Sequence, residues 1–358
     1  MRYVFKRRYE QDLHLWRDQY QNRRYRGLAV CAMALPFVTP NFFVSEAVLL
    51  MAYATAGIGL MLLTGFTGLV SLGHSAFFGI GAYVYAIAAN AGVPFPLAFM
   101  LAGTSAAVAG IALGLPTLRL AGTYLAIATL AFAVIVEQLI SKMDTVTGGF
   151  NGLAVRQPEF LTGMLGQNAS VYMIALAAFA VTAWLGGNIL RSPLGRALRA
   201  NRDSELSAKS LGIDVARYRL VAFAISAGMT GLGGGIYALY AGRLAPSAFG
   251  LQLSVQLMLL IMVGGLASLR GAMFGAIFVS LLPQAIAMLR GWLPEAIANA
   301  PGLESGMLGF LLVVFLIYEP EGIDGRFRKL WVYFEQFPLY RKASFQDQRS
   351  YTRTERLH

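Results

Sequence analysis

The chain has 358 residues, of which 57% are hydrophobic and only 13% are charged. Soluble domains carry about 25% charged residues, so the composition excludes an ordinary soluble protein and indicates an integral membrane protein. Because the chain contains a single cysteine, it can form no internal disulfide and no cysteine-based zinc site.

The net charge of +11 is distributed in a way that argues against nucleic-acid binding. Lysines and arginines concentrate before Gly27, between Arg191 and Arg219, and after Gly325, and each of these segments flanks hydrophobic sequence. Positive charges take this distribution on the cytoplasmic side of membrane proteins. We therefore expect the lipid bilayer as a partner and no nucleic acid.

Both ends of the chain are polar segments with a helical pattern. In residues 1–26, large apolar residues recur every three or four positions, and basic residues lie mostly on the other faces; the apolar positions are Phe5, Tyr9, Leu13, Trp16 and Tyr20. This pattern predicts a cytoplasmic amphipathic helix in the membrane interface, and a helix packed on its own domain is the alternative. Residues 321–358 repeat the pattern as a cytoplasmic amphipathic tail, with Phe327, Leu330, Trp331 and Phe334 on one face.

Residues 27–320 form the predicted transmembrane domain. Its apolar segments approach the roughly 20 residues that a helix needs to cross a bilayer. The predicted class is therefore an all-α polytopic membrane protein with about ten transmembrane helices. The predicted spans are Gly27–Val44, Glu46–Thr64, Ser75–Asn90, Phe95–Pro116, Leu118–Ser141, Ser170–Leu190, Leu220–Leu239, Leu251–Gly265, Gly271–Leu289 and Leu303–Tyr318.

The charges also predict the orientation. If the N-terminus is inside and the chain crosses ten times, 25 of the 29 lysines and arginines lie on the inner side. Such a bias is strong enough to fix the topology. Both termini and the loop 191–216 are then cytoplasmic, and the segment from Lys142 to Ala169 is the longest outer loop.

The loop 191–216 carries the signals of two short helices. Ser192 and Pro193 are a capping residue and a residue with a helical φ angle, which together begin a helix. Asp203 or Ser204 can begin the second helix, and Gly212 can end it in the left-handed conformation.

The predicted spans contain few ionisable side chains, whereas ion-coupled carriers place such groups deep in the membrane. The chain also has no phosphate-binding loop of its own. We predict no catalytic residue, no metal site and no cofactor. The protein then either receives work from a partner through the loop 191–216 or is a self-sufficient channel or secondary carrier.

The glycine-rich segment Gly65–Gly81 is poorly suited to an uninterrupted helix. Irregular backbone at membrane depth occurs where it is buried in protein or lines a cavity, and broken helices form substrate sites in transporters. Close helix packing is the favoured role of the glycines. For Ser71, His74 and Ser75, lining of a translocation path and structural hydrogen bonding are equally good interpretations.

Two further residues are candidates for the path. Thr129 lies in a long apolar segment, where its hydroxyl could instead bond to its own helix. Glu137, toward the outer end of the same segment, could attract an ammonium group or cap a neighbouring loop.

The outer loop contains a turn-rich element that could be a tight loop or a docking surface for an external partner. Its candidate docking residues are Thr147, Gly148, Gly149 and Asn151.

Several ordered motifs together resemble the LivM-type permease subunit of branched-chain amino acid ABC importers, a broader family that includes urea and amide permeases. The matching segments are Gly68–Tyr83, Gly122–Phe132, Thr147–Gly152, Gly195–Ile213 and Glu319–Gly322.

The resemblance implies that Gly195–Ile213 is the cytoplasmic loop that docks on an ATPase subunit. Glu205, Ala208 and Gly212 match the loose signature E-x-x-A-x-x-x-G, whereas Leu206 and Ser207 depart from a strict Glu-Ala-Ala run. Gly195, Arg196 and Arg199 complete the candidate coupling residues. Ala267 occupies a position where the resemblance leads us to expect glycine.

The resemblance further implies a bacterial inner (plasma) membrane location and an alternating-access cycle. The implied partners are a homologous, LivH-like permease subunit, two ATP-binding subunits that bind the ATP, and a periplasmic solute-binding protein. The implied solutes are branched-chain or other hydrophobic amino acids, with urea or short amides as the alternative.

Overall fold

The computed structural model describes residues 19–118, 120, 122–158, 166–290, 302–318 and 322–336. Residues 1–18 of the predicted N-terminal helix and the end of the predicted C-terminal tail lie outside these ranges. The predicted motif Glu319–Gly322 is described only at Gly322.

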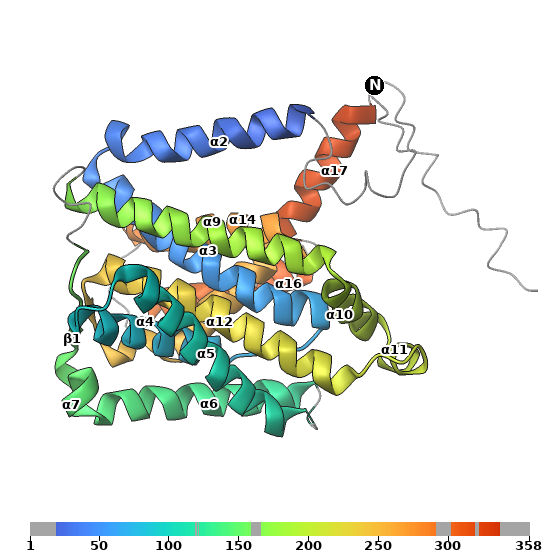
Figure 1. Cartoon of the computed structure of the whole chain (residues 1–358). Helices are drawn as coiled ribbons and strands as arrows, with labels where there is room; N and C mark the ends of the chain where they lie inside the picture. The colour runs from blue at the N-terminus through green and yellow to red at the C-terminus, as the bar shows by residue number, and fades with distance from the viewer. Residues whose placement is uncertain are drawn as a thin grey trace, which may run out of the picture.

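Long helices run side by side and make up most of the described structure (Figure 1). Short elements lie at the two opposite ends of this bundle, with the helices α10 and α11 at one end and the helix α7 and the strand β1 at the other (Figure 1). The helices are α2 (Gln19–Val38), α3 (Asn41–Thr67), α4 (His74–Asn90), α5 (Phe95–Thr117), α6 (Thr123–Lys142), α7 (Asp144–Thr147), α9 (Gln167–Arg191), α10 (Pro193–Asp203), α11 (Glu205–Ser210), α12 (Val215–Ala241), α13 (Leu251–Gly264), α14 (Leu269–Arg290), α16 (Leu303–Tyr318) and α17 (Gly322–Gln336). Two 3-10 turns, η1 (Gly149–Asn151) and η2 (Pro246–Phe249), and two strands, β1 (Leu153–Ala154) and β2 (Arg243–Leu244), complete the described elements.

The all-α membrane class is confirmed. Within the described ranges, seven helical segments are long and apolar enough to cross a bilayer. They are α3, α5, α6, α9, α12, the segment Pro246–Gly264 that contains α13, and most of α14. Helices also occupy the other three predicted spans, but α4 has 17 residues, α16 has 16, and the apolar part of α2 is short.

Two predicted boundaries are wrong. The segment Gly27–Val44 is not one helix, because α2 ends at Val38 and α3 begins at Asn41 after Pro40. A proline disfavours helical backbone at the residue before it, so the chain turns here. The predicted span beginning at Leu118 begins instead at Thr123, since Gly122 has a φ of +57° and stands outside the helix.

Helix α12 lies at the centre and packs against α3, α4 and α5. Glycines permit this close packing: the position of a Cβ atom at Gly81 falls on the backbone of Gly231, and that at Gly234 falls on the carbonyl of Phe78. Small residues that let helix backbones touch are the usual means of packing helices in membranes. The favoured interpretation of the glycines, close packing, therefore holds at Gly81.

The turn between α13 and α14 lies against the end of α3. Ala267 has a φ of +64° and is the non-glycine residue with positive φ in the described part of the chain. Its backbone nitrogen lies 2.7 Å from the position of a Cβ at Gly65. The expectation of glycine at Ala267 thus has a physical basis, because side chains disfavour this conformation.

Gly81→Ala should destabilise the protein by about 1–3 kcal/mol, because the new methyl group overlaps α12. Gly309→Ala in α16 is the matched control, since the structure leaves open space at that position. The measurement is the thermal unfolding midpoint in detergent. Equal midpoints for the two variants would contradict the packing assigned to Gly81.

Candidate coupling loop and translocation path

The two short helices predicted in the loop 191–216 are present as α10 and α11. Ser192 precedes Pro193 at the start of α10, although its hydroxyl donates to the carbonyl of Ile189 (2.7 Å) instead of capping α10. Ser204 caps α11 by accepting a hydrogen bond from the Ser207 backbone amide. Gly212 follows α11 with a φ of +80°, as predicted.

The signature residues of this loop make contacts within the chain. Glu205 binds Lys209 (2.9 Å) and Arg219 (2.6 Å), which fastens α11 to α12. The Lys209 hydrogen bond, together with the positive charge of Arg219, holds the pKa of Glu205 below its usual value despite partial burial. Ala208 is buried, and a Cβ at Gly195 would lie 2.5 Å from the Leu190 carbonyl oxygen. These residues therefore set the shape of the loop.

Two leucines that the sequence reasoning did not select form the exposed apolar part of the loop. Leu206 is 82% exposed and Leu211 is 77% exposed. Both stand among charged and small polar residues in a polar interruption between apolar helices, and this signal could have identified them. Such a pair at the tip of a loop is suited to contact another protein.

Two of the α10 arginines, Arg199 and Arg202, contact the end of α3. The Arg199 guanidinium lies 5.2 Å from the centre of the Phe66 ring, a cation–π geometry. Arg202 donates a hydrogen bond to the carbonyl of Gly65, and Arg196 donates one to the carbonyl of Arg191 (3.3 Å). Arg202 was not among the predicted residues, yet it ties the loop to the last turn of α3.

The helix interruption predicted in Gly65–Gly81 lies between Thr67 and His74. Gly68 ends α3 in the left-handed conformation, with a φ of +74°. The Leu72 amide donates to the hydroxyl of Thr129 (3.0 Å), and a Cβ at Gly73 would lie 2.5 Å from the Thr129 carbonyl oxygen. Thr129 also donates to the Ala126 carbonyl, so it bonds to its own helix while it holds the interruption.

His74 lies in a buried chain of hydrogen bonds. Its Nδ1 is 3.0 Å from Ser71 Oγ, and its Nε2 is 2.7 Å from Ser226 Oγ. Ser226 donates to the carbonyl of Gly59 (2.7 Å), so its oxygen accepts from Nε2–H and Ser71 donates to Nδ1. Ser75 accepts from Ser254 (2.7 Å). Of the two interpretations left open, the structure supports structural hydrogen bonding for these side chains.

Glu137 is half-buried in α6 and faces the start of α13. A Cβ at Gly250, which precedes α13, would lie 3.0 Å from Glu137 Oε2. A carboxylate is favourable at this positive end of a helix. The carboxylate thus lies beside the start of α13, and its roles in capping and in the path stay predictions. Within the described residues, no group of three or more histidine, cysteine, aspartate and glutamate side chains could hold a metal ion.

The outer turn-rich element is an ordered turn at the end of the bundle opposite α10 and α11 (Figure 1). The Thr147 hydroxyl lies 2.6 Å from the Ile140 carbonyl oxygen, and both Gly148 and Gly149 have positive φ. The Asn151 carbonyl accepts a hydrogen bond from Arg243 (2.8 Å). Phe150 is 86% exposed, and its exposure could not be inferred from the sequence pattern.

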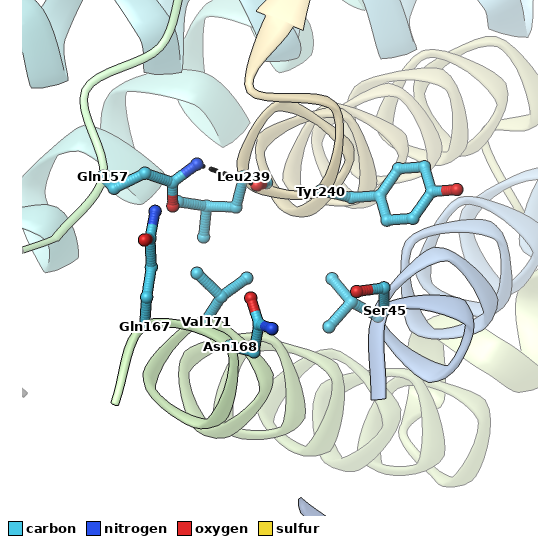
Figure 2. A pocket seen from close by; sticks show the side chains of 8 residues that line it. Ser45, Gln157, Gln167, Asn168, Val171, Leu239 and Tyr240 are labelled. Carbon is cyan, nitrogen blue, oxygen red and sulfur yellow. Dashed lines mark hydrogen bonds between the residues drawn. The ribbon is translucent and has the colours of Figure 1, made fainter. Parts of the chain in front are cut away.

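A polar cavity of about 170 Å³ lies at this same end of the bundle, which is the predicted outer end. Figure 2 shows Gln157 and Gln167 on one side, Ser45 and Tyr240 on the other, and Asn168 and Val171 between them. The lining residues come from the starts of α3 and α9, the end of α12 and the segment that follows β1.

Residues 42–316 match the family described as branched-chain amino acid transport system / permease component. The chain belongs to this permease family. The high-affinity branched-chain amino acid transport system permease protein LivM of Escherichia coli is 32% identical over 322 residues, which cover 83% of this chain and 73% of that protein.

Two more distant relatives show the breadth of the permease family. The probable branched-chain amino acid transport permease protein LivM of Methanocaldococcus jannaschii is 26% identical and covers 79% of this chain and 85% of its own length. The autoinducer 2 import system permease protein LsrC of Escherichia coli is 27% identical over 84% of this chain and 86% of its own length. No solved structure matches the chain.

The ion pairs of Glu205 give this permease a defined pH response. Because the folded-state pKa of Glu205 is lowered, its stabilising contribution is full above the unfolded pKa of about 4.3 and is lost as pH falls through the folded value. Glu205→Gln should therefore lower the thermal unfolding midpoint at pH 7, and the difference from the parent should shrink below about pH 4. A constant difference across this range would refute the ion pairs.

Proposed function

We propose that this permease is one of the two membrane-spanning subunits of an ATP-driven importer in the bacterial inner membrane. The solutes that fit best are branched-chain or other hydrophobic amino acids. The relatives named LivM support this solute class, and membership of the permease family supports transport without covalent chemistry by this chain. The single structural observation that carries the proposal is the pair of exposed leucines on a loop fastened to the transmembrane core.

The proposed topology has about ten spans and cytoplasmic termini. Residues 27–320 form the permease domain, and residues 1–26 and 321–358 are amphipathic cytoplasmic segments. The opposite positions of α10–α11 and α7–β1 support this arrangement, because they place the predicted inner and outer loops at opposite ends (Figure 1).

The proposed partners act at these two ends. Two ATP-binding subunits bind ATP, and one of them receives Leu206 and Leu211 while the buried signature residues hold α10 and α11 in place. A homologous permease subunit completes the translocation path. A periplasmic solute-binding protein docks at the outer turn, where Thr147, Gly148 and Gly149 hold the backbone that presents Phe150 and Asn151.

The candidate path residues have an indirect role in this proposal. Ser71, His74, Ser75 and Thr129 hold the interruption between α3 and α4, and Glu137 holds the start of α13. They thereby shape the surfaces that face the solute when the two permease subunits assemble.

Leu206→Asp should abolish copurification of the ATP-binding subunit, because a charge replaces the exposed apolar contact. Ser210→Asp is the matched control in the same helix, since this position is already polar and exposed. Uptake of radiolabelled leucine by the reconstituted importer should fall at least tenfold in Leu206→Asp and stay near the parent value in the control.

Three outcomes would contradict the proposal. Retained binding and uptake in Leu206→Asp would refute the docking role of the leucines. Uptake of urea but not of leucine would identify urea, instead of an amino acid, as the solute. ATP-independent uptake by the permease alone would identify a channel or secondary carrier.

A further inference from the structure

The polar cavity at the outer end has the size of a small metabolite. An apolar cavity of about 150 Å³ accommodates benzene, which has six heavy atoms. The cavity of about 170 Å³ described above therefore accommodates a molecule of roughly six to eight heavy atoms. Valine falls in this range.

Two helix ends of opposite polarity meet at this cavity. Helix α9 begins at Gln167, so Gln167 and Asn168 stand at its positive end, where backbone amides lack partners within the helix. Leu239 and Tyr240 stand in the last turn of α12, where carbonyl groups make the negative end. Discontinuous helices in transporters use such ends to hold an anion and a cation.

One buried oxygen atom of a lining residue adds to the negative side. The Gln157 amide nitrogen donates to the Leu239 carbonyl (3.1 Å), which fixes the amide. Its Oε1 is then buried without a hydrogen-bond partner among the described residues. Glu46 Oε2 is also buried without a described partner, but Glu46 is not among the residues that line the cavity. Buried acceptors of this kind are costly unless a donor reaches them.

Apolar side chains complete the lining. Val48, Val171 and Leu239 contribute to the wall, and none of the described lining residues is lysine or arginine. The cavity thus combines a place for an anion, a place for a cation and an apolar wall.

We propose that this cavity is an outer subsite for a free α-amino acid with an apolar side chain. The carboxylate lies at the start of α9, the ammonium group lies toward Gln157 Oε1 and the end of α12, and the side chain packs on Val48 and Val171. This inference rests on the proposed transport function and adds a solute site within this one subunit.

Cysteine protection in the full importer tests the subsite. Cys31 is replaced by serine, and Ser45→Cys is labelled from outside with a membrane-impermeant thiol reagent. L-valine should slow labelling at least fivefold. Phe150→Cys, exposed at the same end, is the control and should label at the same rate with and without valine. Asn168→Cys provides a second labelling position.

Valine analogues test the two charged ends separately. Isobutylamine lacks the carboxylate and isovalerate lacks the ammonium group, so each should need at least a tenfold higher concentration to protect. Gln157→Leu should raise the protecting concentration of valine at least tenfold, whereas Gln252→Leu, on exposed surface elsewhere, should not.

Leucine uptake by the same vesicles separates this inference from the proposed function. If leucine is taken up but valine protects neither Ser45→Cys nor Asn168→Cys from labelling, the subsite is refuted while the proposed transport function stands. Equal protection by isobutylamine and valine would overturn the amino acid assignment, because it identifies a site for cations alone. Absence of uptake with the complete importer would overturn the proposed function itself.

Discussion

The interruption between α3 and α4 is the constraint on which the rest of the structure depends. Breaking a helix inside a membrane leaves backbone groups that must find partners within the protein. Here the partners come from several elements: Thr129 of α6 accepts from Leu72, Arg202 of α10 donates to Gly65, and His74 bonds to Ser226 of α12. The interruption therefore joins α3, α4, α6, α10 and α12 in one polar network within an otherwise apolar bundle.

This network gives the loop 191–216 a mechanical connection to the membrane helices. Arg199 and Arg202 fix α10 on the end of α3, while Glu205 fixes α11 on α12 through Arg219. If a partner moved the exposed leucines, the movement would reach α3 and α12 through these contacts. The exposed residues Leu206 and Leu211 would receive the force from the partner, and signature residues such as Glu205 would transmit it to the membrane helices.

Local sequence signals predicted the local structure well. Ser192–Pro193, Ser204 and Gly212 marked the two loop helices, and the glycine-rich segment marked the interruption. The polar partners were not predictable, because Ser226 and Ser254 lie 152 and 179 residues from the side chains they bind and no periodicity links them. The contacts of Arg199 and Arg202 with the end of α3 were also hidden, since both are charged, exposed residues in a polar loop. Helix ends at Pro40 and Gly122 were missed because apolar residues lie on both sides of each position.

The most direct test of this account is the ratio of solute uptake to ATP hydrolysis in the reconstituted importer carrying Arg202→Ala. Removing the hydrogen bond to Gly65 should leave the exposed leucines and the bound ATP-binding subunits in place but disconnect α10 from α3. The account predicts hydrolysis within about twofold of the parent and uptake reduced about tenfold, as expected for loss of a charge-assisted hydrogen bond worth about 1.5 kcal/mol. An unchanged ratio of uptake to hydrolysis would contradict it.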